Sequence, residues 1–186
     1  MKRILKYLKG TITYELCIGR HTVNEQLIDF DDVSWASGKG TRKSNSGYIF
    51  MLGESVLNRS CRRQTCVALS SSEAKLIALA EACKEAYWIR QILEDYARKC
   101  IGPIIIHEDN QNCPRQNQNG KFSNRSKHID VRFFFIKDYV ERGLIQCTYC
   151  PTEVIVADIL TKAFPRERFQ QLREWCRLMN SNEEEC

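Results

Sequence analysis

The stretch Val67–Leu93, VALSSSEAKLIALAEACKEAYWIRQIL, decides how the rest of the chain folds. Apolar residues recur at three- and four-residue spacing from Leu76 to Tyr87, which is the period of a helix with one buried stripe. Ser70 and Glu73 have the spacing of a capping box at the start of that helix. We therefore expect one long helix whose first turn is held by its own side chains.

Patterns typical of strands and further helices flank this helix on both sides. Strands are expected at Thr11–Ile18, Leu27–Trp35, Gly47–Leu52, Ser55–Cys61, Pro103–His107 and Leu144–Tyr149. Helices are expected at Met1–Lys9, His128–Arg142 and Pro165–Met179, and Gln111–Gly120 is expected to be a loop because it contains Pro114 and few apolar residues. Three hairpin-linked strands followed by alternating helices and strands predict an α/β domain with a mixed sheet.

Composition limits the class of protein. The chain has 186 residues, 43% of them hydrophobic, and a net charge of +5, which is compatible with an anionic partner without requiring one. Of the ten cysteines, Cys147 and Cys150 lie close together, but no second pair completes a zinc site. No signal-peptide pattern or membrane-length apolar run is present. We expect free thiols, no membrane partner, and a cytoplasmic or nuclear location.

Six blocks of sequence resemble one known family in order and spacing. They are KRILKYLKGT (Lys2–Thr11), TRKSNSGYIFMLG (Thr41–Gly53), the stretch Val67–Leu93, HEDNQ (His107–Gln111), SKHIDVRFFFIKD (Ser126–Asp138) and YCPTEVIVADILTKAFPRERF (Tyr149–Phe169). Together they resemble the ribonuclease H domain of copia-type retrotransposon Pol polyproteins. The resemblance implies a ribonuclease H-like fold with a five-stranded mixed sheet. It divides the chain into a reverse transcriptase remnant (1–10), the domain itself (11–164), and a C-terminal helix with an acidic tail (165–186).

The resemblance also implies an activity, which is metal-dependent hydrolysis of the RNA strand of RNA–DNA hybrids. Four carboxylates of the family hold two Mg²⁺ or Mn²⁺ ions, and Asp32, Asp109 and Asp158 match three of them. Their ordinary alternatives are a solvated strand residue, a helix cap and a surface acid, respectively. Two other functions stay open: an inactive nucleic-acid-binding remnant of a Pol polyprotein, and an integrase core, which would need a different third acid.

The fourth carboxylate is the point where this chain departs from the family. The family usually has glutamates at both matching positions, whereas this chain has Glu73 and Lys75. Two residues apart, side chains turn about 200° around a helix axis, so the two positions are not interchangeable. In ribonucleases H the metal-binding glutamate lies a turn or more inside the helix, which position 75 fits better. Lys75 is then expected to reduce or abolish activity, and Glu73 as the surviving ligand is the alternative.

Basic residues form two further groups that could contact a phosphate backbone without reading sequence. The candidates are Arg42, Lys43, Arg62 and Arg63 in the first group and Arg125, Lys127, His128 and Arg132 in the second. For each of them, ordinary solvated charge is the alternative. The expected partners are nucleic acid and the remainder of a Pol polyprotein, and the sequence does not indicate an oligomeric state.

Overall fold

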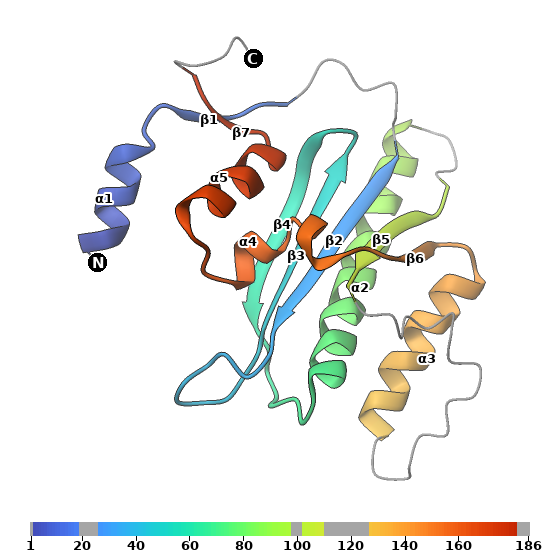
Figure 1. Cartoon of the computed structure of the whole chain (residues 1–186). Coiled ribbons are helices and arrows are strands. Elements are labelled where there is room, and N and C mark those ends of the chain that lie inside the picture. Colours follow the sequence, from blue (N-terminus) through green and yellow to red (C-terminus); the bar gives the residue numbers. More distant parts are fainter. Residues whose placement is uncertain (1, 19–25, 98–101, 110–126, 182–186) are drawn as a thin grey trace.

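The computed structural model describes residues 2–18, 26–97, 102–109 and 127–181. Its centre is a five-stranded sheet with the strand order β4-β3-β2-β5-β6 (Figure 1). The strands are β2 (Leu27–Ser34), β3 (Asn45–Leu52), β4 (Ser55–Arg63), β5 (Ile104–Glu108) and β6 (Ile145–Tyr149). β2, β3 and β4 pair antiparallel, whereas β5 pairs parallel with β2 and β6. The expected mixed α/β sheet is confirmed.

Helices cover both faces of this sheet (Figure 1). The helices are α2 (Ser71–Ala97) and α3 (Lys127–Glu141) on one face, and the short turn η1 (Thr152–Val154), α4 (Asp158–Thr161) and α5 (Arg166–Trp175) on the other. The larger apolar core joins α2 and α3 to the sheet around Phe50 and Leu79, and a smaller one joins Phe30 to Ile155 near α4. Gly143, which follows the end of α3, has a φ of +66°, a conformation that glycine favours after a helix C-terminus.

The two ends of the chain meet in a separate two-stranded sheet. After α1 (Lys2–Gly10), β1 (Tyr14–Leu16) pairs antiparallel with β7 (Leu178–Asn180). The expected strand Thr11–Ile18 is therefore shorter than predicted. The expected helix Pro165–Met179 is wrong at its end, because Arg177 takes a φ of +56° and turns the chain into β7.

The cysteines depart in part from the expectation that all thiols are free. Cys17 is disulfide-bonded, so the expectation of free thiols is wrong there; spacing in the sequence does not show which cysteines meet in space. The free thiols among the described residues are Cys61, Cys66, Cys83, Cys147, Cys150 and Cys176.

Across the described ranges, no helix is long and apolar enough to cross a membrane. The expected loop Gln111–Gly120 lies outside the described residues.

Strand β2 buries three aspartates in its middle, which is unusual for a central strand. Side chains alternate along a strand. Val33 packs with α2 residues and Phe30 with residues near α4, so Asp29 and Asp31 lie on the α2 face and Asp32 on the α4 face. Asp29 is fully buried, and this burial raises its pKa well above the ordinary range. Burial, followed by repulsion from Asp29, does the same to the pKa of Asp31.

Asp29→Asn is expected to make the protein more stable near neutral pH. Because burial raises the pKa of Asp29 in the folded state, the folded protein holds more protons than the unfolded chain. Its contribution to stability is then complete below about pH 4 and is lost as the pH rises toward the folded-state pKa. Asparagine cannot ionise, so the gain should shrink toward acidic pH. Urea denaturation across this range measures it, with Asp95→Asn, at an exposed carboxylate, as control; a pH-independent difference would contradict the assignment.

Candidate active site

Gly47 lets α4 lie directly against the centre of the sheet. It faces Asp32 in the register of β2 and β3. A Cβ atom added at Gly47 would lie 2.8 Å from Thr161 Cγ2 and 3.2 Å from Leu160 Cβ, too close for a larger residue without movement of α4. This close approach brings Thr161 against β2, where its hydroxyl donates a hydrogen bond to Asp32.

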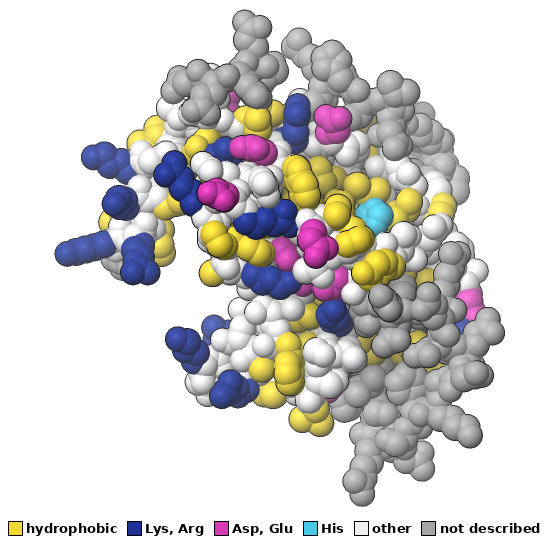
Figure 2. All heavy atoms as spheres, in the orientation of Figure 1, with side chains coloured by type: hydrophobic (Ala, Val, Ile, Leu, Met, Phe, Trp, Pro, Cys, Tyr) yellow, Lys and Arg dark blue, Asp and Glu magenta, His cyan; other side chains and the backbone are white. Residues whose placement is uncertain are grey.

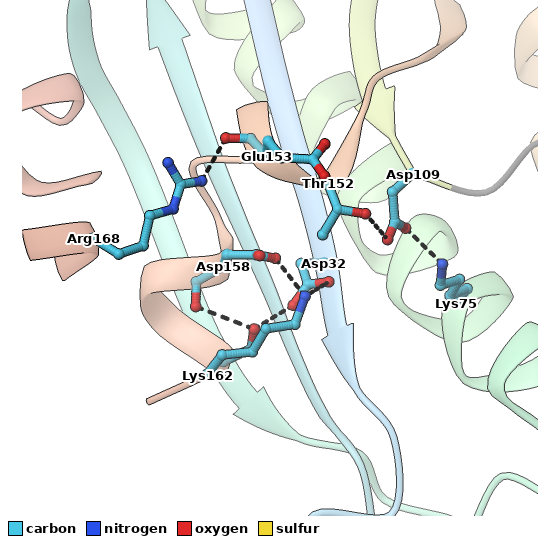
Figure 3. A network of polar contacts seen from close by, with 9 residues as sticks. Asp32, Lys75, Asp109, Thr152, Glu153, Asp158, Lys162 and Arg168 are labelled. Atoms are coloured by element: carbon cyan, nitrogen blue, oxygen red, sulfur yellow. Dashed lines mark hydrogen bonds and ion pairs between the residues drawn. The ribbon is translucent and has the colours of Figure 1, made fainter. Parts of the chain in front are cut away.

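One ammonium group joins Asp32 to Asp158 (Figure 3). The Nζ atom of Lys162 lies 2.7 Å from Asp158 Oδ1 and 3.1 Å from Asp32 Oδ1. Both aspartates are buried. Burial raises the pKa of Asp158 to about 6, although the hydrogen bond from Lys162 acts to lower it. Burial acts to lower the pKa of Lys162, but its bond to Asp158 and the two carboxylate charges outweigh that effect and raise the pKa.

A second ammonium group holds Asp109, which directly follows β5. Lys75 Nζ lies 2.6 Å from Asp109 Oδ1, and both side chains are mostly buried. The hydroxyl of Thr152 donates a 3.2 Å hydrogen bond to the other carboxylate oxygen of Asp109. Figure 3 shows the Lys75–Asp109 pair beside the cluster of Asp32, Asp158 and Lys162. Lys75 therefore contacts Asp109, one of the three sequence-matched aspartates.

Glu73 is engaged at the start of α2. Its backbone N–H donates to Ser70 Oγ at 3.1 Å, and its carboxylate Oε2 accepts a 2.7 Å bond from the backbone N–H of Leu69. This is the reciprocal arrangement of a capping box, reaching one residue further back than usual. Glu73 is buried in this arrangement. Its carboxylate stabilises the helix N-terminus, while Lys75 occupies the position beside Asp109.

The arrangement fits divalent ions only in the type of its oxygen ligands. Carboxylate oxygens are the ligands that Mg²⁺ prefers, and three aspartates supply them. However, Lys75 and Lys162 take up oxygens of these aspartates. In the part of the chain that the structure describes, no three His, Cys, Asp or Glu side chains form a group that could hold a metal ion. As arranged, the residues do not fit a two-metal centre, and the metal-ligand roles of Asp32, Asp109 and Asp158 stay predictions.

Three polar residues of the site were not singled out from the sequence. They are Thr152, Thr161 and Lys162, all in the block Tyr149–Phe169. Lys162 follows Asp158 by four residues, a spacing that places two side chains on one side of a helix. That spacing was a usable signal for the Lys162–Asp158 pair. The contacts of Thr152 and Thr161 join segments more than 40 residues apart, so no local pattern reports them.

The first group of basic candidates lies near this site. Across the sheet, Asn45 pairs with both Ser34 and Arg63. The paired residues Asp32 and Gly47 lie two positions further along the same strands. Arg62, Arg63 and Arg42 are exposed, and Lys43 is half-buried. Figure 2 shows Lys and Arg side chains interspersed with Asp and Glu at the centre of one face. In the second group, Arg132 is half-buried on α3, whereas Arg125 and the side chains of Lys127 and His128 lie outside the described residues.

Comparison with known proteins identifies relatives that align with most of the chain. No protein-family model matches the chain. The retrovirus-related Pol polyprotein from transposon TNT 1-94 of Nicotiana tabacum is 32% identical over 174 residues, 94% of this chain. The Pol polyprotein from transposon RE1 of Arabidopsis thaliana is 32% identical over 170 residues, 91% of this chain. The chain is a homologue of copia-type retrotransposon Pol polyproteins. It spans 13% and 12% of the lengths of these two relatives.

Solved structures show which fold this Pol homologue has. LC11-RNase H1 in complex with RNA/DNA hybrid aligns with a TM-score of 0.52 at 15% identity, over 73% of this chain and 93% of that chain. The N-terminal RNase H domain of a Mycobacterium tuberculosis protein aligns with a TM-score of 0.54 at 11% identity, over 81% and 98%. The Pol homologue therefore has the ribonuclease H-like fold that its sequence blocks implied.

Glu73→Gln is expected to lower the free energy of unfolding by about 1 kcal/mol or less, because it weakens a cap and removes a charge that favours the helix N-terminus. Urea denaturation measures this loss. Glu81→Gln, at an exposed carboxylate paired with Lys84 on the same helix, is the matched control and should change stability by less than about 0.5 kcal/mol. Equal stability of Glu73→Gln and the natural protein would contradict the capping role.

Proposed function

We propose that this Pol homologue is a ribonuclease H-like domain that binds RNA–DNA hybrids and whose metal-dependent cleavage of the RNA strand is impaired. The observation that carries this proposal is the 2.6 Å contact between Lys75 and Asp109. The fold and the Pol relatives support the class of activity. The crystal structure of LC11-RNase H1 is that of a complex with RNA/DNA hybrid, which supports the same class of substrate here.

The proposed impairment follows from charge. Hydrolysis in this class needs two divalent ions, Mg²⁺ or Mn²⁺, and Asp32, Asp109 and Asp158 are the proposed remaining ligands. An ion approaching Asp109 would have to displace the ammonium of Lys75 and then remain beside it. Position 75 also offers no carboxylate of its own. Loss of a single charge-stabilising group in an active site typically costs about 10²–10³ in rate.

The proposed binding of hybrid does not need metal ions. Phosphates of a bound hybrid could contact basic residues just before β3 and at the end of β4, which lie next to each other in the sheet. These residues are Arg42, Lys43, Arg62 and Arg63. Arg125, Lys127, His128 and Arg132 are the proposed second set. Such contacts track the backbone without reading bases, so the affinity should fall steeply with salt concentration. We further propose that the domain works beside the other parts of a Pol polyprotein.

An active enzyme with Glu73 as the metal ligand is the second candidate. It would need the Glu73 carboxylate to leave the N–H of Leu69 and replace Lys75 beside Asp109. The capping bonds at 2.7 and 3.1 Å favour the impaired site over this candidate.

Lys75→Glu is expected to raise Mg²⁺- or Mn²⁺-dependent cleavage of an RNA–DNA hybrid by about 10²-fold or more, because it removes a cation and adds a ligand. Lys75→Gln removes only the cation and should give a smaller gain. Gel analysis of a labelled RNA strand measures the rate. Lys84→Glu, the same charge change at an exposed position on the same helix, is the control and should give no gain. Fast cleavage by the natural protein that Glu73→Gln abolishes would contradict the proposal.

A further inference from the structure

A groove of about 690 Å³ lies between α1 and α5. Its lining residues come from α1, the following turn, β1, Phe164 and the length of α5 from Arg166 to Arg173, and none of them belongs to the candidate active site. Figure 2 shows dark blue side chains of Lys and Arg gathered where Figure 1 places α1. The volume is in the range of sites for small ligands, about 300–1,000 Å³. The groove is therefore a separate candidate binding site.

The groove is strongly cationic. Arg3, Lys6, Arg166 and Arg173 line it, and no Asp or Glu is among its described lining residues. Within the described ranges, Arg173 is the lining cation that pairs with a carboxylate, Glu174. Arg3, Lys6 and Arg166 are exposed. Clustered positive charge that is not neutralised inside the protein favours an anionic ligand.

Arg173 is the buried cation of the groove lining. Its side chain is only 10% exposed, and its ion pair with Glu174 is long at 3.4 Å. Its guanidinium lies 4.3 Å from the centre of the Tyr14 ring. In the described part of the chain, the buried Nε atom has no hydrogen-bond partner. A buried guanidinium with an unused donor is costly, and its positive charge adds to the cationic lining of the groove.

Aromatic rings line the groove beside the cations. Tyr7 is 45% exposed and meets Phe169 edge-on, with ring centres 6.1 Å apart, so an exposed ring surface is available beside positive charge. Phosphate-binding cations interleaved with aromatic rings are the combination that binds single-stranded nucleic acid, because unpaired bases can stack on the rings. In a duplex the bases are already stacked on each other. The rings therefore favour an unpaired strand over a duplex.

We propose that the groove between α1 and α5 binds a single-stranded segment of nucleic acid. The cations Lys6, Arg166 and Arg173 contact its phosphates, and Tyr7 stacks on a base. This site is independent of hybrid cleavage and of the proposed hybrid contacts around Arg62 and Arg63. The same protein would then hold a hybrid at one surface and an unpaired strand at another.

Fluorescence anisotropy with a labelled single-stranded DNA of about ten nucleotides, a length within the usual site sizes, tests the proposal on the full chain. Lys6→Glu should weaken binding about tenfold or more and flatten its salt dependence, because it removes a phosphate contact. Lys9→Glu, the same change at an exposed residue of α1 that does not line the groove, should change affinity less than about threefold. Circular dichroism of both variants checks that the fold is retained.

A second pair of variants tests how much the aromatic rings contribute to single-strand binding. Tyr7→Leu should weaken single-strand binding by roughly fivefold or more through lost stacking, whereas Tyr96→Leu, at an 89% exposed tyrosine on α2, should leave it unchanged. The Arg62→Glu/Arg63→Glu variant should bind single strands normally even if it loses hybrid, which separates this proposal from the proposed function. Equal weakening by Lys6→Glu and Lys9→Glu would overturn the groove as the site. Tighter binding of a duplex, with the same dependence on Lys6 and Tyr7, would overturn the single-strand assignment.

Discussion

Ionised carboxylates removed from water need positive charge beside them, and at the candidate active site two lysine ammonium groups supply it. Lys162 neutralises Asp32 and Asp158, and Lys75 neutralises Asp109. A buried charge without a partner costs several kcal/mol. These pairs therefore help to hold α4, the end of β5 and the start of α2 in place around β2. The same pairs occupy the oxygens that a divalent ion would need. Stability of the site and metal binding therefore compete for the same atoms.

Local patterns predicted most of the fold. The apolar period and the Ser70–Glu73 cap predicted α2, and alternation predicted the hairpins before it. Contacts between distant segments were missed. β7 pairs with β1 across more than 160 residues, and no periodicity in either three-residue strand could reveal it. The left-handed residue Arg177, which ends α5 early, is likewise not a residue type that favours such a turn.

The sequence predicted only part of the candidate active site. Family resemblance selected Asp32, Asp109 and Asp158, and it also favoured position 75 over Glu73 as the place of the helix ligand. In the structure Lys75 contacts Asp109, whereas Glu73 caps the helix. The sequence places three aspartates within four residues of β2. Strand alternation divides them between two faces, with Asp29 and Asp31 under α2 and Asp32 under α4. The role of Lys162 depended on its contact with Asp32, 130 residues away in the sequence.

We propose that Lys75 occupies the place of a metal ligand. The most direct measurement is anomalous X-ray scattering from crystals of the natural protein and of Lys75→Glu, each soaked in Mn²⁺. We expect an anomalous peak among Asp32, residue 75, Asp109 and Asp158 in the variant and none there in the natural protein. A Mn²⁺ peak between these aspartates in the natural protein, with Lys75 displaced or Glu73 turned in as a ligand, would contradict it.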